Sequence, residues 1–401
     1  MSVFAPADPA FVADPYPAYA TLRDGARAQY HEQTNQWLIP RHADVNALLR
    51  DRRLGRSYLH VVTHEEMGRP AEPGWLEPFW HVIRNGMLDR EPPDHTRLRR
   101  LVSRAFTPRV VEQLRPRVQA IMDTLVDRVA GAGSFDLVRE LAEPLPVAVI
   151  AELLGIPAED RHALRPWSAD ICGMYELNPT DEAGRTAVRA AVEFSEYLRA
   201  LSRERRQSPG NDLISGLAAV VDAGDQLTED ELIGTCVLLL NAGHEASVNG
   251  TANAWWSLFR HPDQRARLRG DHPSLLATAV DELLRYDTPL QMFERWALEP
   301  ISVGEIDIPR GSELALLFGS ANRDPAAFER PNTLDLAREP NPHVSFGAGI
   351  HYCLGAPLAR MEMEISFDTI LRRLPSLRLE AEPAWKPSYI IRGLRELRVS
   401  A

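Results

Sequence analysis

The sequence predicts a mainly α-helical protein with a small β-rich part. Helical periodicity of apolar residues dominates residues 108–221. A complete helix-start signal at residues 227–232 is followed by no proline until Pro262, which predicts one long helix over residues 229–260. Strand-forming residues occur in short runs near residues 28–40 and 288–311. We therefore expect helices to make up most of the fold and short hairpins to form the rest.

Bulk composition narrows the class of protein. Apolar residues make up 44% and charged residues 25% of the 401 residues, the usual balance of a soluble globular protein. The net charge of −11 argues against general binding to nucleic acid or acidic membranes. The three cysteines are widely spaced and predict neither a disulfide framework nor a zinc site. Residues 1–10 lack the features of a secretion signal, and no apolar run reaches membrane-spanning length. We expect a single cytoplasmic domain over residues 1–401.

The first hundred residues predict a mixture of short elements. Residues 1–20 are rich in proline and aromatic residues and predict an extended arm that leads into a short helix at about 18–24. A strand hairpin is expected over residues 28–40, with its turn at 33–35, and a helix over 43–50. Residues 57–93, which include Trp80 and Met87, predict a long irregular segment. We interpret this segment as a lid over a pocket; a surface loop anchored by its tryptophans is the alternative.

Helices then follow one another. Asp94, after two prolines, is expected to cap a helix that carries several arginines. Residues 165–206 predict two helices separated by 178–180. In the long helix over 229–260, Thr228 and Glu231 have the spacing of a capping box. The middle of that helix, residues 241–247, places a glycine and an acid inside an apolar helix expected to be buried. Such a local inconsistency tends to mark function.

A glycine-rich stretch, residues 346–355, delivers a single cysteine to the start of a helix expected from about residue 356. Glycines let the backbone turn tightly and lie close to a flat partner. The positive end of a helix dipole and its free N–H groups both favour thiolate over thiol at Cys353. A buried thiolate on such a loop suits an anionic axial ligand for iron.

These residues resemble the heme-ligand signature of the cytochrome P450 family. The fixed positions Phe-x-x-Gly-x-x-x-Cys-x-Gly are matched by Phe346, Gly349, Cys353 and Gly355. The resemblance implies the cytochrome P450 fold and heme b (iron-protoporphyrin IX), with Cys353 as the metal ligand. It also implies a monooxygenase of the EC 1.14 type, an oxidoreductase.

The resemblance extends to the middle of the long helix. Ala242 and Gly243 match positions that leave room above the iron, and Glu245 matches one near a water chain. At the position of the family's usual threonine the chain has Ala246, followed by Ser247. Some family members that modify polyketides share this Ala-Ser pair. They look as if they recruit a substrate hydroxyl and ordered water in place of the threonine hydroxyl. We expect the same here.

Further residues are assigned by the same resemblance. The expected heme propionate contacts are His95, Arg99, Arg295 and His351. The expected structural support of the cysteine loop is Glu282, Arg285 and Arg338, since residues 282 and 285 share one helix face. The expected substrate pocket comprises Trp80, Met87, His244, Leu290, Met292, Phe293 and Ile390.

The expected function is hydroxylation of a natural-product intermediate, a macrolide or an aromatic polyketide, in secondary metabolism such as antibiotic biosynthesis. No Rossmann, phosphate-binding or flavin motif is visible, so electrons are expected from a separate ferredoxin and ferredoxin reductase. The substrate is a small molecule, and the sequence leaves open whether it arrives free or tethered to a carrier protein. Oxidative phenol coupling at the same heme is the alternative chemistry. A non-catalytic heme-binding sensor is the alternative from another class.

Overall fold

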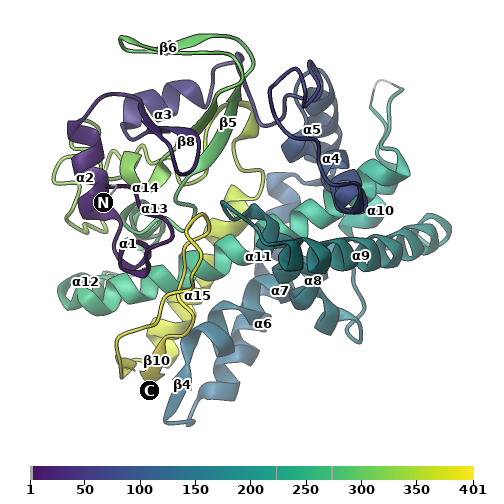
Figure 1. The fold of residues 1–401 in the computed structure, drawn as a ribbon. Coiled ribbons are helices and arrows are strands. Elements are labelled where there is room, and N and C mark those ends of the chain that lie inside the picture. Colours follow the sequence, from purple (N-terminus) through teal and green to yellow (C-terminus); the bar gives the residue numbers. More distant parts are fainter. Residues whose placement is uncertain (1–2, 223, 272–273) are drawn as a thin grey trace. The chain divides into compact units, whose positions relative to one another are not determined.

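The computed structural model describes residues 3–222, 224–271 and 274–401 (Figure 1). About 54% of it is helical, which confirms the prediction of a mainly α fold. The chain forms two compact units. Unit 1 comprises residues 1–54, 118–145 and 246–401, and unit 2 comprises residues 55–117 and 146–245. Within the described ranges, no helix is both long and apolar enough to cross a membrane.

Unit 1 contains the strands of a five-stranded, a three-stranded and a two-stranded sheet, except for Gly55 at the end of β3. Its main sheet has the strand order β1-β2-β8-β5-β3, and the predicted hairpin over 28–40 is its β1–β2 pair. Strand β8 pairs in parallel with β2 and antiparallel with β5. A buried apolar cluster that includes Ile39, Leu316 and Phe318 packs this sheet. The strands are β1 (Gln29–His31), β2 (Gln36–Ile39), β3 (Leu54–Gly55), β4 (Ser134–Asp136), β5 (Phe293–Ala297), β6 (Ile301–Val303), β7 (Ile306–Ile308), β8 (Glu313–Leu316), β9 (Arg378–Leu379) and β10 (Arg398–Ser400).

The helices of unit 1 lie before, between and after the strands of this sheet in the sequence (Figure 1). They are α1 (Pro9–Ala13), α2 (Tyr16–Asp24), α3 (His42–Leu48), α12 (Pro262–Gly270), α13 (Leu276–Tyr286), α14 (Phe318–Ala321) and α15 (Ala356–Arg373). Helices α6 (Pro108–Val129), α7 (Pro144–Leu154) and α11 (Glu229–Arg260) contribute residues to both units. Helix α11 has the predicted bounds, so its start signal was read correctly.

Unit 2 is built from helices and short turns. Its helices are α4 (Glu77–Asn85), α5 (Asp94–Ala105), α8 (Leu164–Cys172), α9 (Asp181–Gln207) and α10 (Leu213–Ala219). Two 3-10 turns matter below, η2 (Met87–Asp89) and η5 (Gly173–Tyr175). Helices α8 and α9 are separated as predicted, and Thr180 caps α9 by accepting a hydrogen bond from the Ala183 amide.

The expectation of an irregular segment over 57–93 was wrong, because it contains helix α4. Its prolines do not prevent the helix, since Pro78 lies in the first turn, where no amide donor is needed. The segment is also anchored. A Cβ added to Gly184 of α9 would lie 2.7 Å from the Trp75 ring, and the Arg185 guanidinium lies 4.7 Å from the centre of that ring.

Three smaller expectations also need correction. The N-terminal arm contains helix α1 within its described part. Asp94 is the first residue of α5 and not its cap; Pro93 holds the cap position, and Asp94 pairs with Arg90 at 3.0 Å. The hairpin near residues 306–311 turns earlier than expected, since residues 306–308 form strand β7 and pair with β6. In each case the local residue types fit two structures, and tertiary pairing selects between them.

Candidate functional site

The cysteine loop has the predicted geometry at the start of α15. Cys353 is half-buried, and its amide donates a hydrogen bond to the Phe346 carbonyl at 2.9 Å. Gly355 is the N-cap of α15, and the Ala359 amide bonds to its carbonyl at 2.9 Å. The sulfur therefore lies next to the N-terminal end of an 18-residue helix, where the helix dipole favours negative charge.

Two glycines of this loop occupy positions that other residues would strain. Gly347 and Gly349 have φ of +68° and +69°. A Cβ added to Gly349 would lie 2.4 Å from the Leu49 carbonyl oxygen, so the loop is pressed against the end of α3. Gly355 differs, because an added Cβ would lie in ordinary contact with the Cys353 sulfur at 3.9 Å.

A buried carboxylate braces the segment before the loop. Glu282 accepts hydrogen bonds from Arg285 Nε at 2.7 Å and Nη2 at 2.9 Å, and from Arg338 Nε at 3.0 Å. Glu282 and Arg285 are fully buried. Arg285 also donates to the carbonyls of Asn322 and Pro331. The three residues predicted to act as support are thus in direct contact.

Sequence reasoning noted Arg360 only as part of the family pattern, yet it holds the loop directly. Its guanidinium lies 4.4 Å from the centre of the Phe346 ring, and its Nε donates to Asp281 at 2.7 Å. His343 also contacts Asp281, at 3.3 Å. Burial alone would raise the pKa of Asp281, but the hydrogen bonds from His343 and Arg360 outweigh it and hold the pKa below its ordinary value.

The four residues predicted to contact propionates belong to different units. In unit 1, Arg295 on β5 is 2% exposed, with its guanidinium 4.5 Å from the centre of the Phe293 ring, and His351 is partly buried. In unit 2, His95 and Arg99 are four residues apart on α5, so they share one helix face. A buried guanidinium stays charged and needs an anionic partner, which suits a carboxylate ligand.

The other arginines of α5 are engaged elsewhere. Arg97 pairs with Glu231 and Asp225. Arg100 and Arg104 both pair with Asp222. The sequence shows only that this helix carries several arginines and does not indicate these ion pairs. They tie α5 to the segment that leads into α11.

Helix α11 begins with the predicted capping box. The Thr228 hydroxyl accepts from the Glu231 amide at 3.2 Å, and the Glu231 carboxylate accepts from the Thr228 amide at 2.9 Å. Burial all round its middle was expected and is only partly found. Val237 and Leu240 are buried, whereas Leu238 is half-exposed. The helix therefore has an open side.

The open side is made of small residues one turn apart. Ala242 is exposed, although it lies in the middle of a 32-residue helix. Gly243, Ala246 and Ser247 are partly exposed, and so is Glu245, which was expected to be buried. Residues 238, 242 and 246 lie on one face because they are four apart. Of the five residues predicted to take part in catalysis, Ala242 and Ala246 lie on this face, while Gly243, Glu245 and Ser247 lie elsewhere round the helix and are partly exposed.

The glycine of this stretch serves helix packing. A Cβ added to Gly243 would lie 2.9 Å from the Ile150 Cδ1 atom of α7. His244, predicted to lie in or beside the pocket, is buried on the other side of α11, where its Nδ1 lies 3.1 Å from the Ser168 hydroxyl of α8. Its role in substrate binding stays a prediction, and the open face does not include it.

The remaining predicted pocket residues fall into two groups. In unit 1, the amide of Gln291 donates to the Ile390 carbonyl at 2.9 Å, and Leu290 forms a β-bridge with Ile391. This pairing brings together the segments that carry the predicted pocket residues Leu290, Met292, Phe293 and Ile390. In unit 2, Trp80 lies on α4 and Met87 follows on η2.

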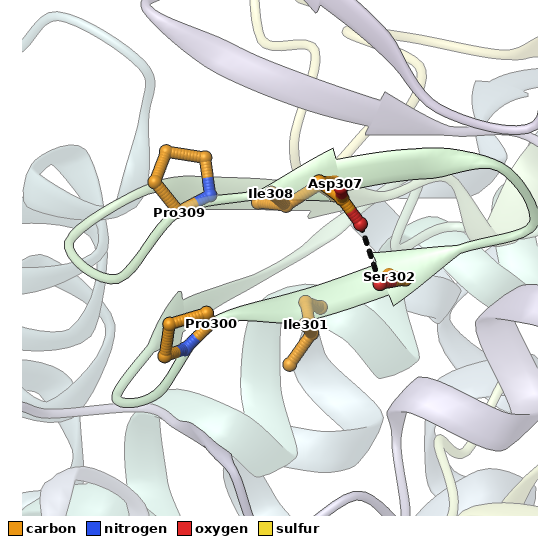
Figure 2. A pocket seen from close by; sticks show the side chains of 6 residues that line it. All are labelled: Pro300, Ile301, Ser302, Asp307, Ile308 and Pro309. Atoms are coloured by element: carbon orange, nitrogen blue, oxygen red, sulfur yellow. Dashed lines mark hydrogen bonds between the residues drawn. The ribbon is translucent and has the colours of Figure 1, made fainter.

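A shallow cleft of about 310 Å³ lies at the β6–β7 hairpin (Figure 2). Its lining residues are Pro300, Ile301, Ser302, Asp307, Ile308 and Pro309. The Ser302 hydroxyl donates to Asp307 at 2.7 Å, so the polar groups of the cleft satisfy each other. None of the predicted site residues lines it, and we assign it no role.

Comparison with known proteins identifies the family. The cytochrome P450 family model matches residues 57–383. The cytochrome P450 monooxygenase PikC of Streptomyces venezuelae is 40% identical, over 97% of this chain and 91% of its own. The polyketide biosynthesis cytochrome P450 PksS of Bacillus subtilis is 39% identical, over 91% of this chain and 88% of its own.

Among solved structures, P450BioI in complex with an acyl carrier protein ligated to hexadec-9Z-enoic acid has a TM-score of 0.91. It is 37% identical and covers 98% of this chain and 99% of its own. The chain therefore belongs to the cytochrome P450 family and has its fold. It is a heme-thiolate monooxygenase related to polyketide and macrolide hydroxylases.

Members of this family bind heme b, which is thus the cofactor of this chain. The residues in place fit that group. The loop around Cys353 has its backbone held close by two glycines in the left-handed region. In the same unit, Arg295 is a buried cation of the kind that binds a carboxylate. When bound, heme supplies the redox chemistry with O2 that no side chain of the chain can supply.

Proposed function

We propose that this monooxygenase hydroxylates a hydroxyl-bearing polyketide intermediate, a macrolide or an aromatic polyketide. Residues 1–401 act as one catalytic domain in the cytoplasm. The observation that carries the proposal is the open face of α11, where Ala246 stands at the position of the family's usual threonine and is followed by Ser247. The relative PksS, named for polyketide biosynthesis, supports the substrate class.

The reaction inserts one oxygen atom into a C–H bond of the substrate. The second oxygen atom of O2 is reduced to water by two electrons and two protons. The electrons come from a separate ferredoxin, itself reduced by a ferredoxin reductase. This arrangement agrees with the family's use of ferredoxin-type partners.

The chain's own residues bind the heme, leave space for the substrate and hold the water that delivers protons. When heme is bound, Cys353 would hold its iron, and Gly347 and Gly349 would keep the backbone of the loop in the conformation that presents the sulfur. Ala242 and Ala246 leave space for O2 and substrate. Glu245 and Ser247 hold ordered water on the open face of α11, and a hydroxyl of the substrate replaces the threonine hydroxyl in proton delivery.

Four further residues hold the heme propionates by charge-assisted hydrogen bonds. They are His95, Arg99, Arg295 and His351. These side chains orient the heme and take no part in proton delivery.

The substrate reaches the enzyme either free or on a carrier protein. The solved relative P450BioI was captured with an acyl carrier protein, which supports testing the tethered form. A screen of free and carrier-bound polyketides by heme spectral shift, followed by product analysis, decides between the two.

The Ala246→Thr variant tests the role of the open face. If a substrate hydroxyl already serves proton delivery, the added threonine should raise NADPH oxidation without product, or leave turnover unchanged. A large gain in coupled turnover would contradict the proposal. Ala120→Thr, the same change at an exposed position of α6, is the matched control. A reduced carbon-monoxide spectrum without the thiolate-type Soret shift would reject the enzyme class itself.

A further inference from the structure

A polar cluster of one buried and three partly buried side chains lies in unit 2, outside the residues assigned so far. Four segments meet there. Arg56 follows β3, and its Nη2 lies 3.6 Å from Oδ1 of Asp89, the last residue of η2. Tyr175 ends η5 and lies near both of these charges, and Asn241 of α11 lies beside the Tyr175 hydroxyl. Met87, a predicted pocket residue, shares η2 with Asp89.

Asn241 is the unusual member of this cluster. It is 2% exposed, and neither polar atom of its amide makes a hydrogen bond of ordinary length within the described part of the chain. Buried amides almost always have such partners, so an incomplete set points to a ligand group. The next residue, Ala242, is exposed, so Asn241 flanks the open face of α11.

The electrostatics of the cluster select the kind of ligand. Burial raises the pKa of Tyr175, and the nearby Cys172 and Asp89 raise it further, against smaller opposite effects of Asn241 and Arg56. The phenol therefore stays protonated. Arg56 and Asp89 already pair with each other, so the cluster offers a carboxylate ligand no net positive charge. An amide and a phenol together offer donors and acceptors, which a neutral hydroxyl can satisfy at once.

We propose that Asn241 and Tyr175 recognise a hydroxyl group of an uncharged substrate and so fix its orientation over the open face of α11. The inference rests on the proposed function and deepens it, because it names two specificity-determining residues. This hydroxyl is distinct from the one that replaces the missing threonine, since it lies on the flank of α11 and not beside Ala246. A polyketide with several hydroxyl groups can supply both.

Of the two ligand pairs in the test, the first differs in one hydroxyl group and the second compares a neutral alcohol with an anionic acid of the same chain length. Testosterone is paired with androst-4-en-3-one, which lacks its 17-hydroxyl group, and tetradecan-1-ol is paired with the anionic myristic acid. 6-Deoxyerythronolide B is the macrolactone probe. Dissociation constants are measured by heme spectral shift and by calorimetry for wild type, Asn241→Leu and Tyr175→Phe. Tyr197→Phe is the control, because that hydroxyl bonds to Asp160 outside the cluster.

Wild type should bind the hydroxyl-bearing member of a pair more tightly. Asn241→Leu and Tyr175→Phe should each weaken its binding about tenfold, the value of one hydrogen bond, and leave the partner ligand unchanged. Equal weakening of both members in either variant would show a structural role and overturn the inference. The inference would also be overturned if wild type showed no preference between the members of a pair. The same holds if wild type bound the heme ligand 4-phenylimidazole but none of the hydroxyl-bearing probes.

The reduced carbon-monoxide spectrum separates this inference from the proposed function. Both variants should keep the thiolate-type spectrum of wild type. A wild type without that spectrum refutes the proposed function. A normal spectrum without hydroxyl selectivity refutes only the roles of Asn241 and Tyr175.

Discussion

Replacing Glu282 by glutamine should destabilise the protein more than any change at an exposed ion pair. The substitution keeps the shape of the side chain and removes its charge. The carboxylate now accepts three hydrogen bonds from two guanidinium groups and one from the Asp335 amide. Glu282 and Arg285 are fully buried, and Arg338 is nearly so, with 10% of its side chain exposed. The variant would leave two positive charges facing each other without a counter-charge.

The size of the effect follows from these contacts. A hydrogen bond to a charged group contributes about 1.5–3 kcal/mol, so three of them set an upper limit of about 4.5–9 kcal/mol. Contributions within one network are not additive, and removing one partner of a buried pair costs about 3–5 kcal/mol. We expect a loss in that lower range. Because a typical domain is stable by about 5–15 kcal/mol, much of the protein's margin would disappear.

Urea unfolding followed by circular dichroism and by heme absorption measures this loss. Arg338→Met removes the hydrogen bond to Glu282 and three exposed bonds to the carbonyls of Glu329, Arg330 and Thr333. It should cost less, about 1.5–3 kcal/mol, because water can replace the exposed bonds and the Glu282–Arg285 pair stays intact. Glu112→Gln is the matched control, since Glu112 pairs with Arg115 on the exposed side of α6 and should matter by less than about 1 kcal/mol. A Glu282→Gln variant within about 0.5 kcal/mol of wild type would refute the argument that this carboxylate braces the loop.

Three further predictions follow from single contacts. Gly349→Ala should abolish the thiolate-type carbon-monoxide spectrum, because it forces alanine to φ of +69° and a Cβ to 2.4 Å from the Leu49 carbonyl oxygen. The control variant Gly355→Ala should retain the spectrum, and equal loss in both variants would contradict this prediction. Burial raises the pKa of Glu362 from 4.5 to about 8, so the folded acid keeps a proton that the unfolded acid loses, and wild type loses stability as the pH rises from about 5 to about 8. Glu362→Gln should therefore gain stability relative to wild type over that range in urea unfolding, and a difference independent of pH would be the contrary result. Asp222→Asn should lower the free energy of unfolding by about 1 kcal/mol near 0.1 M salt and by less near 1 M, because it removes the ion pairs with Arg100 and Arg104. A loss of stability that does not change with salt would argue against ion pairing.

Several predictions based on local chemistry were confirmed, although that of Asp94 as a helix cap was wrong. The capping box of Thr228 and Glu231 depends only on residues three apart, and it gave the start of α11. The hairpin over 28–40 and the helix after Gly355 depend on similarly local signals. The contact of Arg338 with Glu282 is not local. It could be foreseen because the resemblance to a known family supplied the tertiary arrangement.

Features that depend on tertiary neighbours were missed. The residue pattern of 57–93 contains enough proline to hide α4, which docks through Trp75 against Gly184, far along the chain. The arginines of α5 look like a basic face in the sequence, because their partners Asp222 and Glu231 lie more than a hundred residues later. Nothing in the local pattern indicates such pairs.

Helix α11 shows why composition alone misjudges this site. Its apolar middle predicts burial on every side, yet the sequence does not state which side lacks a covering neighbour. In the structure, the face that carries Ala242 and Ala246 is at least partly exposed. Alanine is small and has the highest helix propensity, so it suits such a position. Small side chains at an uncovered position contribute little to packing, so their identity is free to serve chemistry. The proposed proton delivery by a substrate hydroxyl therefore predicts that changing Ala246 alters coupling while leaving stability nearly unchanged.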